Sequence, residues 1–112
     1  MKALLQRVVE ASVSVSEQTI SRIGPGLLIF LAVERGDGEV NVDRMVHKIA
    51  RMRLFPDTEG RMNHSILEQH RQVLAVSQFT LAADLRKGHR PSFGNAAPPE
   101  MAKPLFDRFC HE

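Results

Sequence analysis

The residues best suited to chemistry are Ser77-Gln78-Phe79-Thr80-Leu81, directly after the apolar run Val73-Leu74-Ala75-Val76. A buried strand holds the polar residues at its end firmly, as a binding or catalytic site requires. Thr80 offers a hydroxyl as nucleophile or hydrogen-bond donor, and Gln78 offers an amide that can orient a carbonyl. Backbone N–H groups at such a strand end are candidates for binding a developing oxyanion. The alternative is a strand that runs into solvent, with serine and threonine present for their β-propensity.

The whole segment from Gln72 to Leu81 is typical of a strand. Strand alternation predicts Gln78 and Thr80 on one face and Ser77 and Phe79 on the other, unless a bulge intervenes.

The loop that follows is basic. Between Leu85 and Pro99 there are three basic residues and no acidic one, with His89 beside them. Arginine and lysine neutralise phosphate without reading sequence, so a phosphate-containing partner is one interpretation and a solvated surface is the other. A second basic run on a predicted helix, which includes Lys48, is more typical of a solvated face.

Composition limits the class of protein. The chain has 112 residues, with 15 Lys and Arg against 13 Asp and Glu, a net charge of +2 that excludes a strongly basic nucleic-acid coat. We therefore expect one domain over residues 1–112. The single cysteine, Cys110, cannot form an internal disulfide and indicates a reducing, cytoplasmic compartment, where we expect a packed or idle thiol. The five histidines lack metal-ligand spacing, so no metal site is predicted.

Periodicity predicts four closely spaced, antiparallel strands in the first third of the chain. They cover residues 2–10, 11–16, 19–23 and 27–33, and the last is apolar throughout, as in a strand buried on both faces. An apolar stripe predicts a helix over 40–53. A last helix is expected to start at Pro98 or Pro99, and Pro104 either kinks it or marks its true first turn.

Seven segments carry a resemblance to a known family, in order and over nearly the whole chain. The most specific are two adjoining motifs, Ser77–Leu81 and Arg86–Phe93. The flanking segments are Met1–Val8, Ala11–Val15, Ile23–Leu28, Gly60–Asn63 and Ala96–Glu100. On these segments the chain resembles the D-aminoacyl-tRNA deacylases, also called D-tyrosyl-tRNA deacylases.

The resemblance implies a proofreading hydrolase that cuts the ester between a D-amino acid and the 3′-terminal adenosine of tRNA, and that also removes glycine. It implies an α+β fold, with an antiparallel, barrel-like sheet and two main helices packed against it. It further implies a cytoplasmic homodimer without a metal or other cofactor. The pocket for the aminoacylated adenosine would be lined by Ser77, Gln78, Phe79 and Thr80, with Met62 nearby. By charge, the candidates for binding the tRNA end are Lys87, His89 and Arg90.

The resemblance also implies substrate-assisted catalysis by the 2′-hydroxyl of the tRNA. An unassisted threonine hydroxyl is a weak nucleophile, and no base lies close to Thr80 in the sequence. We therefore expect Thr80 and Gln78 to position the substrate while backbone N–H groups stabilise the oxyanion.

Members of the family continue past the last helix into strands that carry an Asn-x-Gly-Pro-x-Thr motif, which enters the partner's pocket and blocks L-amino acids. This chain ends at Glu112, and Gly24-Pro25 lies elsewhere in it. We therefore expect a C-terminally shortened member of the family with exposed sheet edges. An active deacylase, a catalytically impaired module that binds tRNA 3′ ends, and a non-functional fragment remain open.

Overall fold

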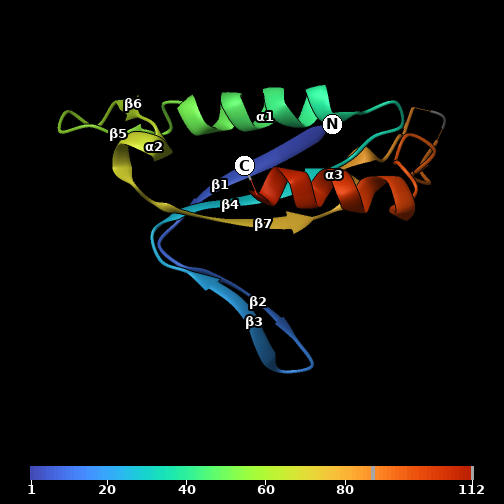
Figure 1. Cartoon of the computed structure of the whole chain (residues 1–112), viewed down its shortest axis with the longest axis horizontal. Helices are drawn as coiled ribbons and strands as arrows, with labels where there is room; N and C mark the ends of the chain where they lie inside the picture. The colour runs from blue at the N-terminus through green and yellow to red at the C-terminus, as the bar shows by residue number, and fades with distance from the viewer. Residues whose placement is uncertain (87, 112) are drawn as a thin grey trace. The chain divides into compact units, whose positions relative to one another are not determined.

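The computed structural model describes residues 1–86 and 88–111. In chain order the elements are β1 (Lys2–Val8), β2 (Ala11–Val15), β3 (Gln18–Ile23), β4 (Gly26–Ala32), α1 (Glu39–Arg51), β5 (Phe55–Pro56), β6 (Met62–His64), α2 (Ile66–Gln69), β7 (Gln72–Ser77), the 3-10 helix η1 (Phe79–Ala82) and α3 (Pro99–His111) (Figure 1). The α+β prediction is confirmed, with α1 and α3 as the two long helices. None of the helices in the described residues is long and apolar enough to cross a membrane.

The strands form a three-stranded sheet in the order β1-β4-β7 and two pairs, β2-β3 and β5-β6. Within residues 1–86 and 88–111 these sheets do not close into a barrel, so the α+β class holds without the barrel-like sheet that the resemblance implied. The chain divides into two compact units, which we describe separately. The first contains Met1–Leu4, Phe30–Val46 and Val76–Glu112, and the second contains Leu5–Ile29 and His47–Ala75. The expectation of one domain over residues 1–112 stays a prediction.

Strand β4 supplies the most deeply buried side chains, as its continuous apolar sequence predicts. Leu27 and Ile29 are 1% exposed and Leu31 is fully buried, and every other residue of the strand is buried or half-buried. Apolar residues at every position leave this strand no face suited to water, so both of its faces are covered.

Strands β4 and β7 run in the same direction. In the second unit the N–H of Gln72 donates to the carbonyl of Pro25 (3.5 Å), and in the first unit the N–H of Gln78 donates to the carbonyl of Leu31 (2.8 Å). The two bonds are six residues apart on both strands, which only a parallel pair allows. An all-antiparallel sheet was therefore the wrong expectation. The long connection through α1 makes the parallel pairing possible, because parallel strands need a crossover.

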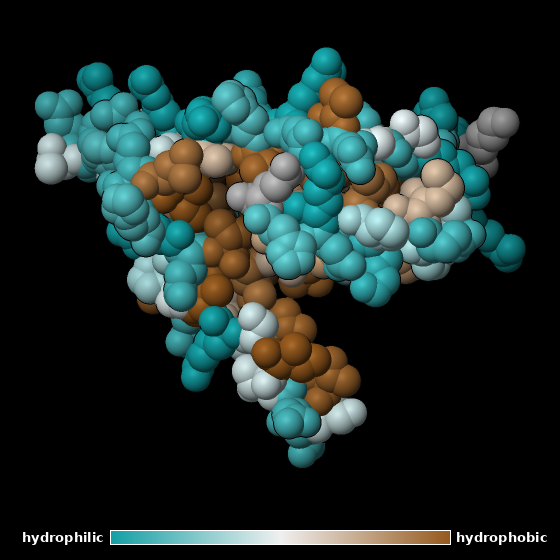
Figure 2. Space-filling view, viewed as in Figure 1, coloured by the Kyte–Doolittle hydropathy of each residue, from teal (hydrophilic) through white to brown (hydrophobic). Residues whose placement is uncertain are grey.

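The antiparallel prediction is confirmed for the hairpin of β2 and β3. Ala11 pairs with Ile23 at its base, and the register shifts between Val13 and Ser14. Some of its apolar side chains face solvent: Val15 is 56% exposed and Ile20 is 66% exposed, and brown apolar residues are visible along this hairpin in Figure 2.

Strand β7 ends at Ser77, so the prediction of a strand as far as Leu81 was wrong. From Phe79 the backbone makes local bonds instead, with the N–H of Leu81 donating to Gln78 and that of Ala83 donating to Thr80. The reason is the partner strand. The next carbonyl in this register, that of Val33, accepts from the N–H of Ala97 instead (2.9 Å), so the ladder with β7 stops there.

Helix α1 covers nearly the predicted range, with Val42 and Ile49 buried on its apolar face. Helix α3 starts at Pro99, where a missing N–H costs nothing, and continues through Pro104. The short helix α2 has a capping box in which Ser65 and Glu68 satisfy each other's backbone N–H groups.

The loop between η1 and α3 is closed by Asp84. Its backbone exchanges two hydrogen bonds with Ser92 (2.7 and 2.8 Å), and its carboxylate accepts from the guanidinium and the backbone N–H of Arg86. These hydrogen bonds from Arg86 lower the pKa of Asp84 to about 2. The positive charge of Arg86 is thus paired with Asp84, which lies one residue before the basic segment 85–99. The charges within that segment alone did not predict this ion pair.

We predict that Gly26→Ala destabilises the protein. A Cβ at position 26 would lie 1.9 Å from the backbone carbonyl oxygen of Gln72, so one of the two backbones must move. We expect the free energy of unfolding in urea to fall by about 2 kcal/mol or more. The control is Gly24→Ala, whose Cβ would have only ordinary contact, at 3.7 Å, with the Gln72 side chain. Equal stability of the two variants would contradict this close approach.

We predict that the Asp84 carboxyl titrates near pH 2, measured by its carbon chemical shift in NMR. Because the folded-state pKa lies below the unfolded one, the pairing stabilises the loop above the ordinary Asp pKa and is lost as the pH falls through about 2. In Arg86→Gln the midpoint should rise toward about 4, whereas Arg90→Gln should leave it unchanged. The same Asp84 midpoint in Arg86→Gln as in the wild type would contradict this pairing.

Candidate functional site

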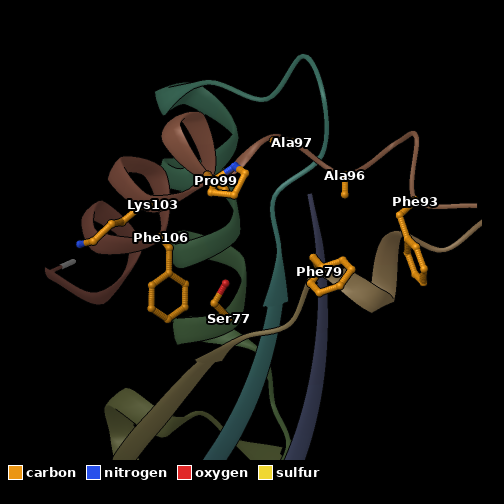
Figure 3. Close-up of a pocket in the computed structure, with 9 residues that line it drawn as sticks. Ser77, Phe79, Phe93, Ala96, Ala97, Pro99, Lys103 and Phe106 are labelled. Atoms are coloured by element: carbon orange, nitrogen blue, oxygen red, sulfur yellow. The ribbon is translucent and has the colours of Figure 1, made fainter.

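A cavity of about 470 Å³ lies in the first unit beside the predicted chemical segment (Figure 3). Three parts of the chain line it. Ser77 and Phe79 come from the end of β7 and the start of η1. The loop before α3 contributes Phe93, Ala96 and Ala97, and α3 contributes Pro99, Ala102, Lys103 and Phe106.

The lining is mostly apolar and aromatic. The rings of Phe79 and Phe93 meet edge to face, with centroids 5.2 Å apart and an interplanar angle of 71°. Phe79 is nevertheless 57% exposed, so its ring offers apolar surface to a ligand. Polar character comes from the Ser77 hydroxyl and the Lys103 ammonium.

Both sides of the cavity are fixed to one stretch of backbone at the end of β4. On one side the N–H of Gln78 donates to the carbonyl of Leu31 (2.8 Å). On the other the N–H of Ala97 donates to the carbonyl of Val33 (2.9 Å). Leu31 and Val33 are buried, so these two anchors sit on a rigid element.

Arg35, two residues further along, holds the loop that carries Phe93. Its backbone N–H donates to Asn95 (2.9 Å), and its side chain donates to the carbonyl of Gly94 (2.6 Å). No local sequence motif marks Arg35 for this role, so it was not predicted.

The structure brings the four predicted residues together at the end of β7. Ser77 and Phe79 line the cavity. Gln78, which lies between them in the chain, and Thr80, which follows Phe79, are not part of its lining. The Gln78 amide donates to the Thr80 hydroxyl. This is a consequence of the 3-10 turn rather than of the predicted strand alternation.

Two backbone N–H groups lie at the start of η1. Across residues 1–86 and 88–111, neither the N–H of Phe79 nor that of Thr80 makes a hydrogen bond to another described residue. The first N–H groups of a helical turn have no partner within it, so both are able to bind an acceptor from outside.

The described lining of the cavity contains none of the other predicted residues. His89 and Arg90 are exposed in the loop and absent from the cavity lining, and Lys87 lies outside the described residues. Met62, on β6, is 60% exposed and belongs to the second unit.

Prediction from sequence missed the α3 side of the cavity. Phe106 and Ala102 looked like core positions on the apolar side of the last helix, and Lys103 drew no attention. The available signal was the segment Ala96–Glu100, which the family resemblance included without a role in the site.

Among the described residues, neither Cys110 nor a cluster of metal-ligating side chains provides a second reactive centre. Burial raises the pKa of the Cys110 thiol, and the charge of Asp107 adds to the shift, so Cys110 favours the protonated form. No cluster of three or more His, Cys, Asp or Glu that could hold a metal ion occurs in the described part of the chain.

Comparisons with known proteins identify the family of this chain. The family model of D-Tyr-tRNA(Tyr) deacylase matches residues 4–112. A D-aminoacyl-tRNA deacylase of Magnetococcus marinus is 54% identical over 110 residues, covering 98% of this chain and 73% of the relative. One of Idiomarina loihiensis is 48% identical over 112 residues, covering 100% and 77%. The chain thus spans about three quarters of these relatives.

Solved structures show the same fold. A "c-Myc DNA Unwinding Element Binding Protein" superposes with a TM-score of 0.93 at 38% identity, covering 99% of this chain and 74% of that one. A probable eukaryotic D-amino acid tRNA deacylase superposes with a TM-score of 0.80 at 22% identity, covering 97% and 64%. With the family model matched from residue 4 to residue 112, the chain belongs to the D-Tyr-tRNA(Tyr) deacylase family, whose curated members are hydrolases of D-aminoacyl-tRNA.

Proposed function

We propose that the cavity binds the aminoacylated 3′-terminal adenosine of tRNA, and that the protein hydrolyses the ester when the amino acid is a D-amino acid or glycine. The observation that carries this proposal is the juxtaposition at the end of β7. An aromatic cavity of about 470 Å³ adjoins two backbone N–H groups that make no hydrogen bond to another described residue. Aromatic rings suit a purine base, and the N–H groups suit the oxyanion that forms during ester hydrolysis.

The protein's contribution to the chemistry is electrostatic and positional. Apart from Lys103, the described residues that line the cavity carry no titratable side chain, so this lining supplies no carboxylate or imidazole as general base. The N–H groups of Phe79 and Thr80 are the donors we assign to the oxyanion, each worth about 3 kcal/mol of transition-state stabilisation. The 2′-hydroxyl of the terminal ribose then assists the attack on the ester carbonyl.

Thr80 acts in this proposal as a positioning group. Its hydroxyl accepts a hydrogen bond from the Gln78 amide, and an amide cannot take a proton as a base would. The hydroxyl keeps its own proton and can donate it to the substrate. Gln78 in turn is held by its backbone bond to Leu31, which keeps the pair in place.

The end of the tRNA lies along the basic loop in this proposal. His89 and Arg90 are exposed there, and Lys87 adds a further charge. Phosphate contacts of this kind orient a nucleic acid without reading its sequence. The proposal also takes from the family resemblance a place for Met62 near the substrate, a homodimer and a cytoplasmic location.

The test of this function is hydrolysis of D-tyrosyl-tRNA, glycyl-tRNA and L-tyrosyl-tRNA by the 112-residue chain, side by side. We expect the D-tyrosyl and glycyl esters to be lost far faster than in buffer. If the L-tyrosyl ester is lost equally fast, the cavity works but chiral selection is absent. If a folded sample binds tRNA and hydrolyses none of the esters, the protein is the binding module and the enzymatic proposal is wrong.

We predict that Thr80→Val lowers kcat by about tenfold to a hundredfold, because it removes a positioning hydrogen bond and no nucleophile. Replacing the terminal 2′-hydroxyl of the D-tyrosyl-tRNA by hydrogen should cost more. Both are measured as single-turnover rates of ester loss. Thr58→Val, at an exposed turn of the second unit, is the matched control. A loss approaching the roughly millionfold known for a removed nucleophile would show that Thr80 attacks the ester itself.

A further inference from the structure

Lys103 is the one charged residue among the nine that line the described cavity. It lies on α3 between Pro99 and Phe106, at a spacing that places all three on the same face of the helix. Figure 3 shows these three side chains on the helix side of the cavity, with Ser77 and Phe79 on the other side. The ammonium of Lys103 points outward, away from Ser77.

The ammonium is available to a further anion. It pairs with Asp107 one turn along α3 (3.0 Å), but the Lys103 side chain is 79% exposed and that of Asp107 is 50% exposed. Exposed pairs of this spacing are weak, and an ammonium has three donors, of which Asp107 uses one. The basic residue therefore stays able to bind a ligand at the cavity rim.

An aminoacyl nucleotide carries two charges of opposite sign. Its α-ammonium adjoins the ester, and its 5′ phosphodiester is negative. Lys103 attracts the phosphodiester and repels the ammonium, so it favours one of the two directions in which the substrate can enter. That direction places the ester against Ser77 and the N–H groups of Phe79 and Thr80.

We propose that Lys103 binds the phosphodiester on the 5′ side of the terminal adenosine and so fixes the orientation of the substrate in the cavity. The stem of Lys103 and the ring of Phe106, on the same helix face, form the wall beside the nucleoside. This inference rests on the proposed function, since it needs the nucleotide in this cavity. Asp107 competes with the phosphate for the same ammonium.

The experiment compares adenosine that carries D-tyrosine on its 3′-oxygen with the same compound bearing a 5′ methyl phosphate. Stable amide analogues of both give Kd values by calorimetry at low salt, and the esters give kcat/KM. In the wild-type chain the methyl phosphate should tighten binding roughly two- to fivefold, the size expected of one exposed charge contact. In Lys103→Met, which keeps the stem, this phosphate effect should vanish, and Lys103→Arg should restore it.

Two further variants sharpen the result. Asp107→Asn removes the competing carboxylate and should enlarge the phosphate effect. Lys48→Met removes an exposed lysine of α1 and should leave the effect unchanged. The proposal is overturned if the wild-type chain binds both analogues equally, if Lys103→Met retains the preference, or if neither analogue binds. Binding with the expected preference but without ester hydrolysis would instead overturn the proposed function alone.

Discussion

The site depends on where the buried strand β4 stops. Its ladder with β7 ends at the bond between Gln78 and Leu31, and with no further partner the chain turns into η1 at Phe79. The same stretch of backbone, at Val33 and Arg35, holds the segment that forms the opposite wall. One continuous stretch of backbone, from Leu31 to Arg35, thus holds both sides of the cavity, and such support helps to keep binding geometry within the tolerance that catalysis needs. A side chain at position 26 would disturb this strand at its other end, where it lies against the backbone of Gln72.

The chemistry that this geometry supports belongs more to the backbone than to reactive side chains. Thr80 is paired with an amide, Cys110 holds its proton, and the described histidines form no metal cluster. What the turn presents is a pair of N–H groups beside aromatic walls. Such donors are already oriented, so they need no reorganisation during the reaction. In the proposed mechanism the 2′-hydroxyl of the substrate assists the attack, so no reactive side chain is required. A site of this kind is difficult to predict from sequence, because every residue except proline has a backbone N–H.

Several charged residues of the first unit form ion pairs. Arg86 is held by Asp84, Lys103 by Asp107, and Arg108 by Asp43 and Glu39 of α1. These exposed pairs add little stability, since solvent screens them. Their effect is on how readily each basic side chain can bind a phosphate. An arginine bound through several hydrogen bonds to a carboxylate is less free to bind phosphate than a lysine with one contact, and this difference separates Arg86 from Lys103.

The sequence by itself determined the buried strand β4, the hairpin of β2 and β3, helix α1, the position of the polar segment from Ser77 to Thr80 and the family. Each has a local sequence pattern, either periodicity or a motif, and such patterns can be recognised without knowledge of the fold. The tertiary structure decided the parallel pairing of β4 and β7, the end of β7 at Ser77 and the α3 wall with Lys103 and Phe106. Those features depend on which distant segment supplies a hydrogen-bond partner or a packing surface. Gln78 and Leu31 are 47 residues apart in the chain, so no local sequence pattern includes both.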